Sequence, residues 1–407
     1  MKTILAAIDG MTETVVDIQT ELVSRPALSP DNNGIGEREK ADWIIGRLRE
    51  MGVSDIREFN APDERTPCGH RPNVAAIIPG RDTSRTFWVI AHMDVVPAGD
   101  DSLWDSDPWT LRRDGDTIIG RGVEDNHQGL VSGMLAAKAI LDAKATPEMN
   151  FGLLMVADEE TGNEYGLRYI AENHLDLFGE NDLVLVPDFG SPDSSLAEVA
   201  EKSMFRLKVT VDGKQCHAST PDDGLNAMVA ASDLVVRISA LKDEFDETDE
   251  LFDPARSTFE PTKREANVEN VNTIPGRDVF YVDARVLPTY DLDEIIGRIG
   301  EMGRETELKY GCTVSVETII REQAAPPTPV DAEIVQRVGR GVKAVTGLDI
   351  KPTGIGGGTV AAQLRHRGVD ALVWSTLNHF AHQPNEQASI ANTLSDAKVM
   401  AHVLLEK

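Results

Sequence analysis

The first half of the chain alternates short apolar runs with longer helical patterns, and this alternation constrains the fold more than any other feature. Apolar runs at 86–91, 150–157 and 183–186 are separated by segments of helical periodicity at 129–143 and 164–173. Strands that alternate with helices in this way are typical of a parallel sheet with crossover helices on its faces. We therefore predict an α/β fold with a mixed, mostly parallel sheet flanked by helices.

Residues 199–322 have a different order of elements. The periodicity there predicts strands at 204–211, 268–273, 279–286 and 313–319, and helices at 225–241 and 292–308. This is the βαββαβ order of a ferredoxin-like domain. We expect a domain made of residues 1–198 plus 323–407, interrupted by an inserted domain at 199–322.

Charge and cysteine usage restrict the partners and the compartment. The 68 acidic side chains outnumber the 40 basic ones, and the resulting net charge of −28 opposes binding to nucleic acid or anionic lipid. No apolar run is long enough to span a bilayer, and the N-terminal one is too short for an export signal. The three cysteines, Cys68, Cys216 and Cys312, are widely spaced. We expect free, buried or semi-buried thiols and a cytoplasmic protein.

Acidic and histidine side chains follow three of the predicted strands directly, and two further clusters lie in glycine-rich or proline-containing loops. The candidates are His92, Asp94, Asp125, Asp158, Glu159, Glu160, Asp188 and His382. Since ligands of open α/β sheets gather at the carboxyl ends of strands, we expect these side chains to converge. Imidazole and carboxylate without thiolate suit hydrolytic zinc, with manganese or cobalt as alternatives.

The spacing of these residues predicts separate roles. His92 and Asp94 share one side of an extended segment, so Asp94 is expected to accept the second imidazole N–H while His92 faces a metal. Glu159 and Glu160 are adjacent and point apart, which allows one to ligate a metal and the other to carry a proton.

The ordered set of motifs resembles the M20 family of metallopeptidases and deacylases. The motifs are His92-Met93-Asp94, Gly120-Arg121-Gly122-Val123-Glu124-Asp125, Asp158-Glu159-Glu160-Thr161-Gly162, Asp188, Gly213-Lys214-Gln215-Cys216-His217-Ala218, Asn272-Thr273-Ile274-Pro275, Asp283-Ala284-Arg285, Gly356-Gly357-Gly358-Thr359 and His382-Gln383-Pro384-Asn385-Glu386. The resemblance implies a zinc-peptidase fold with an inserted lid domain, through which the chain forms a homodimer.

The resemblance also implies the roles of single residues. His92 and Asp188 would bind one zinc, Glu160 and His382 the other, and Asp125 would bridge them. Glu159 would be the general base, and His217 would stabilise the tetrahedral oxyanion, often from the neighbouring subunit. The substrate contacts would be Asn272, Arg285, Gly357, Gly358 and Thr359. Arg285 suits a substrate carboxylate, and the glycine loop offers N–H groups to an anion.

Three positions depart from the family pattern and leave the substrate subgroup open. Asp188 stands where many members have glutamate, Val360 where aspartate is frequent, and His127 where lysine is frequent. We interpret His127 as either a pocket residue or a surface residue. His379 is a less suitable metal ligand than His382, because the family's His-x-x-Asn-Glu pattern begins at His382.

These features predict hydrolysis of an amide bond next to a free carboxylate, as in an N-acyl amino acid deacylase similar to deacetylases and succinyl-diaminopimelate desuccinylases. A dipeptidase, tripeptidase or carboxypeptidase of the same family is the alternative. Two other classes are a non-catalytic scaffold and a nucleotide-dependent oxidoreductase. The dinucleotide loop that an oxidoreductase needs is disfavoured, because Thr359 replaces its last glycine and the loop comes late in the chain.

Overall fold

The computed structural model describes residues 1–407 and divides them into two compact units. The first unit comprises 1–199, 327–353 and 359–407, and the second comprises 200–326 with 354–358. Residues 354–358, which we expected in the first domain, group with the second unit. There the amide of Lys202 donates to the carbonyl of Ile355 (2.9 Å), and Phe252 forms a β-bridge with Gly354.

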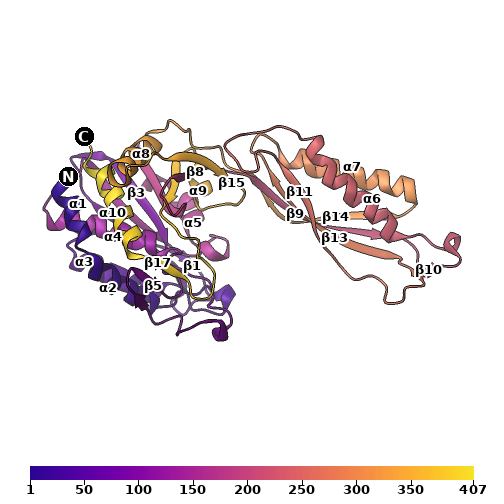
Figure 1. The fold of residues 1–407 in the computed structure, drawn as a ribbon, viewed down its shortest axis with the longest axis horizontal. Coiled ribbons are helices and arrows are strands. Elements are labelled where there is room, and N and C mark those ends of the chain that lie inside the picture. The colour runs from indigo at the N-terminus through magenta and orange to yellow at the C-terminus, as the bar shows by residue number, and fades with distance from the viewer. The chain divides into compact units, whose positions relative to one another are not determined.

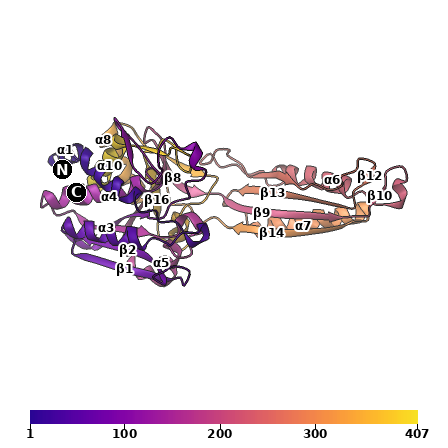
Figure 2. The same ribbon diagram turned by 90° about the horizontal axis from the view of Figure 1, so that it is seen from below.

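An eight-stranded sheet is the centre of the first unit (Figure 1). Its order is β1 (Asp55–Pro62), β2 (His70–Ile78), β6 (Met149–Val156), β3 (Asp82–His92), β7 (Leu183–Gly190), β16 (Ala371–Ser375), β8 (Leu196–Glu201), β15 (Lys351–Ile355). The middle pairings, β6 with β3, β3 with β7 and β7 with β16, are parallel. The antiparallel pair β1–β2 forms one edge and can be followed in Figure 2. The predicted mixed, mostly parallel sheet is confirmed.

Helices cover both faces of this sheet. Their bounds are α1 (Lys2–Asp9), α2 (Thr12–Val23), α3 (Arg38–Glu50), α4 (His127–Asp142), α5 (Leu167–Asn173), α8 (Glu333–Thr346), α9 (Ala361–Arg365) and α10 (Ile390–Leu405). Helix α4 packs on β3 with α1, α2 and α10 around it, while α5 and α9 pack together on the opposite face. The alternation of Val89 toward α4 and Trp88 toward α5 follows from the two-residue period of a strand.

The first unit also contains a small three-stranded sheet. It contains β4 (Arg112–Asp114), β5 (Thr117–Ile119) and β17 (Gln387–Ser389). Strand β17 pairs with β5 although the two are separated by most of the chain. This pairing brings the segment before α4 next to the segment before α10, and both segments carry predicted metal ligands.

The second unit is a four-stranded antiparallel sheet with two helices along one side (Figure 1). Its elements are β9 (Ser203–Asp212), α6 (Ala227–Ser239), β11 (Thr258–Arg264), β13 (Arg277–Val286), α7 (Leu292–Tyr310) and β14 (Thr313–Glu322), with a short ladder of β10 (Cys216–His217) and β12 (Thr273–Ile274). The sheet order is β11-β13-β9-β14, as in a ferredoxin-like βαββαβ unit.

Two expectations from the sequence differ from the structure. The strand predicted at 268–273 is wrong: Thr258–Arg264 takes that place in the sheet, and Val271 is 99% exposed. Pro261 and the charged residues of the actual edge strand, Thr258–Arg264, weaken its apolar pattern. All three cysteines are free, but Cys68 is exposed rather than buried. None of the helices has the length and apolar character needed to cross a membrane.

Candidate metal centre

The parallel pairing of β3 and β6 determines where the first candidate residues meet. His92 is the last residue of β3 and lies opposite Val156 at the end of β6. The turn Glu159–Thr161 follows β6 at once and therefore begins beside His92. Asp188 lies in the neighbouring parallel strand β7.

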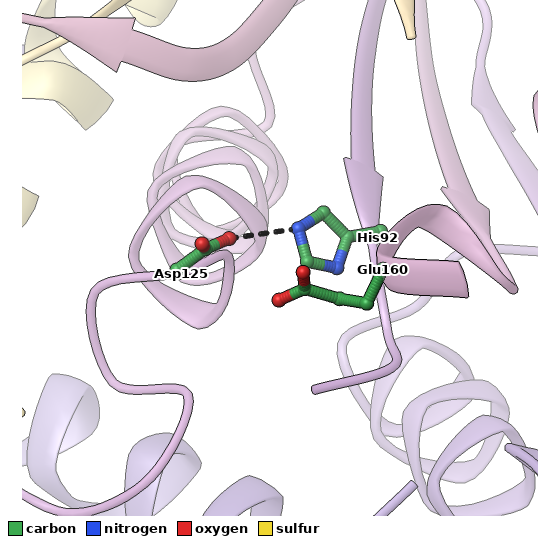
Figure 3. A group of neighbouring side chains, drawn as sticks. All are labelled: His92, Asp125 and Glu160. Carbon is green, nitrogen blue, oxygen red and sulfur yellow. Dashed lines mark hydrogen bonds and ion pairs between the residues drawn. The ribbon is translucent and has the colours of Figure 1, made fainter. Parts of the chain in front are cut away.

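Asp125 contacts a different histidine with each of its carboxylate oxygens. Its Oδ1 lies 2.9 Å from Nε2 of His92, and its Oδ2 lies 3.1 Å from Nε2 of His382. His382 is also 3.1 Å from Oε2 of Glu160, and His92 is 3.8 Å from Oδ1 of Asp188. Figure 3 shows Asp125, His92 and Glu160 directed toward a common point. The carboxylate of Asp125 thus stands between two histidine–carboxylate pairs.

The donor atoms are close enough to hold divalent ions. Ligand atoms of His92, Asp125 and Glu160 lie within 4.8 Å of one another, and so do those of His92, Glu159 and Asp188. The donors are imidazole nitrogens and carboxylate oxygens, the set that zinc takes in hydrolases. Both histidines face the cluster through Nε2, which leaves Nδ1 of His92 to a hydrogen bond that fixes the ring. This donor set fits a metal centre.

The hydrogen bond behind His92 differs in detail from our prediction. Nδ1 of His92 lies 2.9 Å from the main-chain carbonyl of Asp94 and 3.6 Å from its carboxylate. The carboxylate of Asp94 instead accepts from the amides of Glu159 (3.1 Å) and Glu160 (3.0 Å). A single residue therefore orients the histidine and also positions the two adjacent glutamates.

A buried ion network supports the turn that carries Glu159 and Glu160. Arg71 pairs with Glu37 and lies 3.3 Å from Oδ1 of Asp158, and all three are buried. Asp158 has a left-handed φ of 60°, and its Oδ1 accepts from the hydroxyl of Thr161 at 2.5 Å. Moving Asp158 away from Arg71 would leave a buried charge unpaired, which is costly. The network therefore holds the turn in one conformation.

Burial and mutual repulsion raise the pKa values of three acidic groups, Glu159, Glu160 and Asp188. Burial raises the pKa of Glu159 well above its usual value, and the neighbouring charges of Asp188 and Glu160 add to the shift. Burial likewise raises the pKa of Glu160, and that of Asp188 to about 6. Asn126 donates to Oδ1 of Asp188 (2.5 Å) and partly offsets this. A divalent cation would favour the ionised forms of all three carboxylates.

The same carboxylates raise the pKa values of the two histidines. Burial opposes charge on His92, yet hydrogen bonds to Asp125 and Asp94 hold its pKa well above the usual value. Hydrogen bonds to Asp125 and Glu160 raise the pKa of His382 to about 10. Burial disfavours ionised Asp125, but both histidines together hold its pKa below the usual range.

His127 is buried, so of our two interpretations the surface residue is wrong. Its Nε2 lies 2.8 Å from the Nζ atom of Lys40, and Lys40 also donates to the carbonyl of Met93 (2.8 Å). Burial, followed by the charge of Lys40, lowers the pKa of His127 well below its usual value, so the neutral ring accepts from the ammonium. Lys40 is 1% exposed.

The predicted substrate residues lie mainly in the second unit. His217 in β10 contacts Ser219 (Nδ1 to Oγ 2.7 Å) and the amide of Asn272 (3.4 Å). Arg285 in β13 donates to Asp283 (2.8 Å) and to the carbonyl of Gly356 (2.7 Å). Gly357 and Gly358 also belong to this unit, whereas Thr359 belongs to the first. The roles of these residues toward a substrate stay predictions.

Several residues of this centre carry no local signal in the sequence. Lys40, Glu37 and Arg71 come from a helix and a strand far from any motif, and only the folded chain brings them to the ligands. The one indication in the sequence that Asn126 belongs to the centre is that it directly follows Asp125. Glu124 and Glu386 lie inside motifs, but their partners are more than 250 residues away along the chain.

Comparison with known proteins agrees with this geometry. The sequence pattern of peptidase family M20/M25/M40 matches residues 88–406. An uncharacterized metallohydrolase of Methanocaldococcus jannaschii is 38% identical over 97% of this chain and 99% of its own length.

The chain belongs to peptidase family M20/M25/M40. A succinyl-diaminopimelate desuccinylase of Nitratiruptor sp. is 26% identical, over 92% of this chain and 94% of its own. An aminopeptidase of Bacillus cereus has the same fold, with a TM-score of 0.75 at 17% identity over 97% of this chain and 98% of its own. The M20 protein described here is therefore a metal-dependent hydrolase, which displaces the scaffold and oxidoreductase alternatives.

The buried ammonium of Lys40 yields a prediction about stability and pH. Burial lowers the pKa of Lys40 from 10.5 to about 7, although Asp94, Glu37 and Glu386 oppose the shift. Between about pH 7 and pH 10.5, Lys40 is protonated more fully in the unfolded chain than in the folded chain. The contribution of Lys40 to the free energy of unfolding therefore rises with pH. The slope is at most about 1.4 kcal/mol per pH unit.

Urea unfolding of chelator-treated wild type and Lys40→Met at pH 7, 8 and 9 checks this prediction. The wild type should gain stability relative to the variant as the pH rises. Parallel pH dependence of the two proteins would show that Lys40 titrates normally.

Proposed function

We propose that this protein is a di-zinc amidohydrolase that removes the acyl group from an N-acyl amino acid. The single observation that carries the proposal is the position of Asp125, whose two oxygens face separate histidine–carboxylate pairs. In the proposed assignment His92 and Asp188 hold one ion, Glu160 and His382 hold the second, and Asp125 bridges them. Cobalt or manganese suits the same donors.

Glu159 is the proposed general base. Its carboxylate lies with His92 and Asp188 in one group of ligand atoms, and burial raises its pKa well above the usual value, which makes it a better proton acceptor. Glu159 takes the proton of the attacking water and returns it to the leaving amine. When bound, the two ions lower the pKa of that water and polarise the scissile carbonyl. The main-chain amide of Glu159 donates to the carboxylate of Asp94, which holds Glu159 in place.

The proposed substrate carries a free carboxylate next to the amide bond. Arg285, with the backbone of Gly357, Gly358 and Thr359, is assigned to that carboxylate, and Asn272 and His217 to the carbonyl oxygen. Helix α9 begins at Ala361 and has five residues. Its dipole is therefore weak, and Arg285 is the main anion-binding group.

The choice of a deacylase over a peptidase draws on the desuccinylase relative, which is similar along nearly the whole chain. A dipeptidase, tripeptidase or carboxypeptidase uses the same centre and is the second candidate. We further propose a cytoplasmic homodimer joined through the second unit. Exposed apolar side chains of that unit, including Val236 (69%) and Leu308 (89%), support an interface there.

Metal content and metal-dependent turnover test the proposed function directly. Purified protein should contain about two metal ions per chain, and a ninhydrin screen of N-acetyl, N-succinyl and dipeptide substrates should show amine release. Chelation should abolish turnover, and added zinc or cobalt should restore it. Protein that contains no metal and releases no amine under any of these conditions contradicts the proposal.

Replacement of Glu159 separates the base from the metal ligands. Glu159→Ala should lower kcat by at least about 10²-fold, because the water loses its proton acceptor, while metal content stays that of the wild type. Glu164→Ala, at an exposed carboxylate five positions along the chain, is the matched control and should keep full activity. Retained turnover in Glu159→Ala would remove Glu159 as the base.

A further inference from the structure

Two loops of the first unit hold each other through a reciprocal pair of buried glutamates. The first loop, 120–126, precedes α4 and carries Asp125. The second loop, 378–386, precedes β17 and carries His382. Each loop contributes one glutamate whose carboxylate accepts backbone N–H groups of the other loop.

Glu386 of the second loop binds three amides of the first. Its Oε2 accepts from Gly122 (2.9 Å), and its Oε1 accepts from Glu124 (2.9 Å) and Asp125 (3.1 Å). The guanidinium of Arg121 donates to Oε2 at 2.7 Å, and Arg121 also stacks over the ring of Trp104 (5.1 Å to the centroid). The main-chain amide of a metal-ligand candidate, Asp125, is thus fixed directly by Glu386.

Glu124 of the first loop in turn binds three amides of the second loop. Its carboxylate accepts from the amides of Asn378 (2.6 Å), Ala381 (2.9 Å) and Phe380. The exposed fraction is 2% for Glu124 and 1% for Glu386, so water does not compete for these bonds. Hydrogen bonds from N–H groups to an ionised carboxylate are stronger than neutral ones, and burial strengthens them further.

The second loop depends on this arrangement for its conformation. Its backbone is left-handed at three non-glycine residues, His379 (φ 67°), His382 (φ 63°) and Asn385 (φ 57°). Such residues persist where the surrounding structure determines them strongly. Here the determinants are Glu124, which binds the amides on the N-terminal side of His382, and Glu386 on its C-terminal side.

We propose that Glu124 and Glu386 are positioning residues that set the separation of the Asp125 carboxylate from the His382 imidazole, and thereby the affinity for the second metal ion. Neither glutamate is assigned as a ligand. The inference rests on the proposed two-ion function, in which the second ion lies among Asp125, Glu160 and His382. His92 and Asp188 come from strands β3 and β7, so the first ion depends less on the two loops.

Calorimetric titration of zinc into the chelator-treated full-length protein tests the proposal. In Glu386→Gln and in Glu124→Gln, one of the two binding events should weaken about 10–100-fold. The other should weaken less, because Asp125 is assigned to both ions but His92 and Asp188 lie outside the two loops. Because the two glutamates act on one pair of loops, the double variant should lose less than the product of the two single losses. Glu386→Asp keeps the charge, but its shorter side chain cannot keep all the bonds of Glu386 to the first loop, and it should behave like Glu386→Gln.

Glu198→Gln is the matched control, because Glu198 is equally buried, pairs with Arg365 (2.7 Å) and belongs to strand β8. It should lower the melting temperature without changing either zinc affinity. If one loop variant fails to fold by circular dichroism, the other and Glu386→Asp still decide the question.

The outcomes separate the two claims. Wild type that binds two ions and hydrolyses substrate, beside folded loop variants that titrate as the wild type does, overturns the positioning role and leaves the proposed function standing. Equal weakening in Glu198→Gln also overturns it, because the loss then follows from general destabilisation. Wild type that binds no second ion overturns both.

Discussion

The contact of one carboxylate with two histidines is the constraint on which the rest of the first unit depends. Asp125 can face both His92 and His382 only if the end of β3, the loop before α4 and the loop before β17 meet at one point. The parallel pairing of the central strands positions the end of β3. The β17–β5 ladder brings together the loop before α4 and the loop before β17. The sheet therefore sets the spacing of the proposed metal ligands.

Five carboxylates lie close together at this site, and their negative charges are only partly compensated by nearby groups. Asp94, Asp125, Glu159, Glu160 and Asp188 converge, and burial together with repulsion raises the pKa of three of them. Arg71 supplies positive charge nearby but pairs with Glu37 and Asp158, and burial lowers the pKa of Lys40 to about 7, so these two side chains do not balance the cluster. Two divalent cations would add four positive charges, which accounts for a donor set that is poorly ionised without them.

The sequence predicted the parts of this arrangement that are local. Strand ends that run into His92, Glu159 and Asp188 were recognisable, because apolar strands and their polar termini follow short periods. The strand at 268–273 was misplaced, since edge strands with charged faces have weak periodicity. Lys40 and the contacts of Glu124 and Glu386 were not predictable, because each joins segments distant along the chain and leaves no pattern within either.

The most direct test of a two-ion centre bridged by Asp125 is anomalous diffraction at the zinc absorption edge from crystals grown with zinc. The account predicts two anomalous peaks roughly 3.5–4 Å apart. One should lie against His92 and Asp188, the other against Glu160 and His382, with Asp125 contacting both. A single peak, or two peaks that do not share Asp125, would contradict the account.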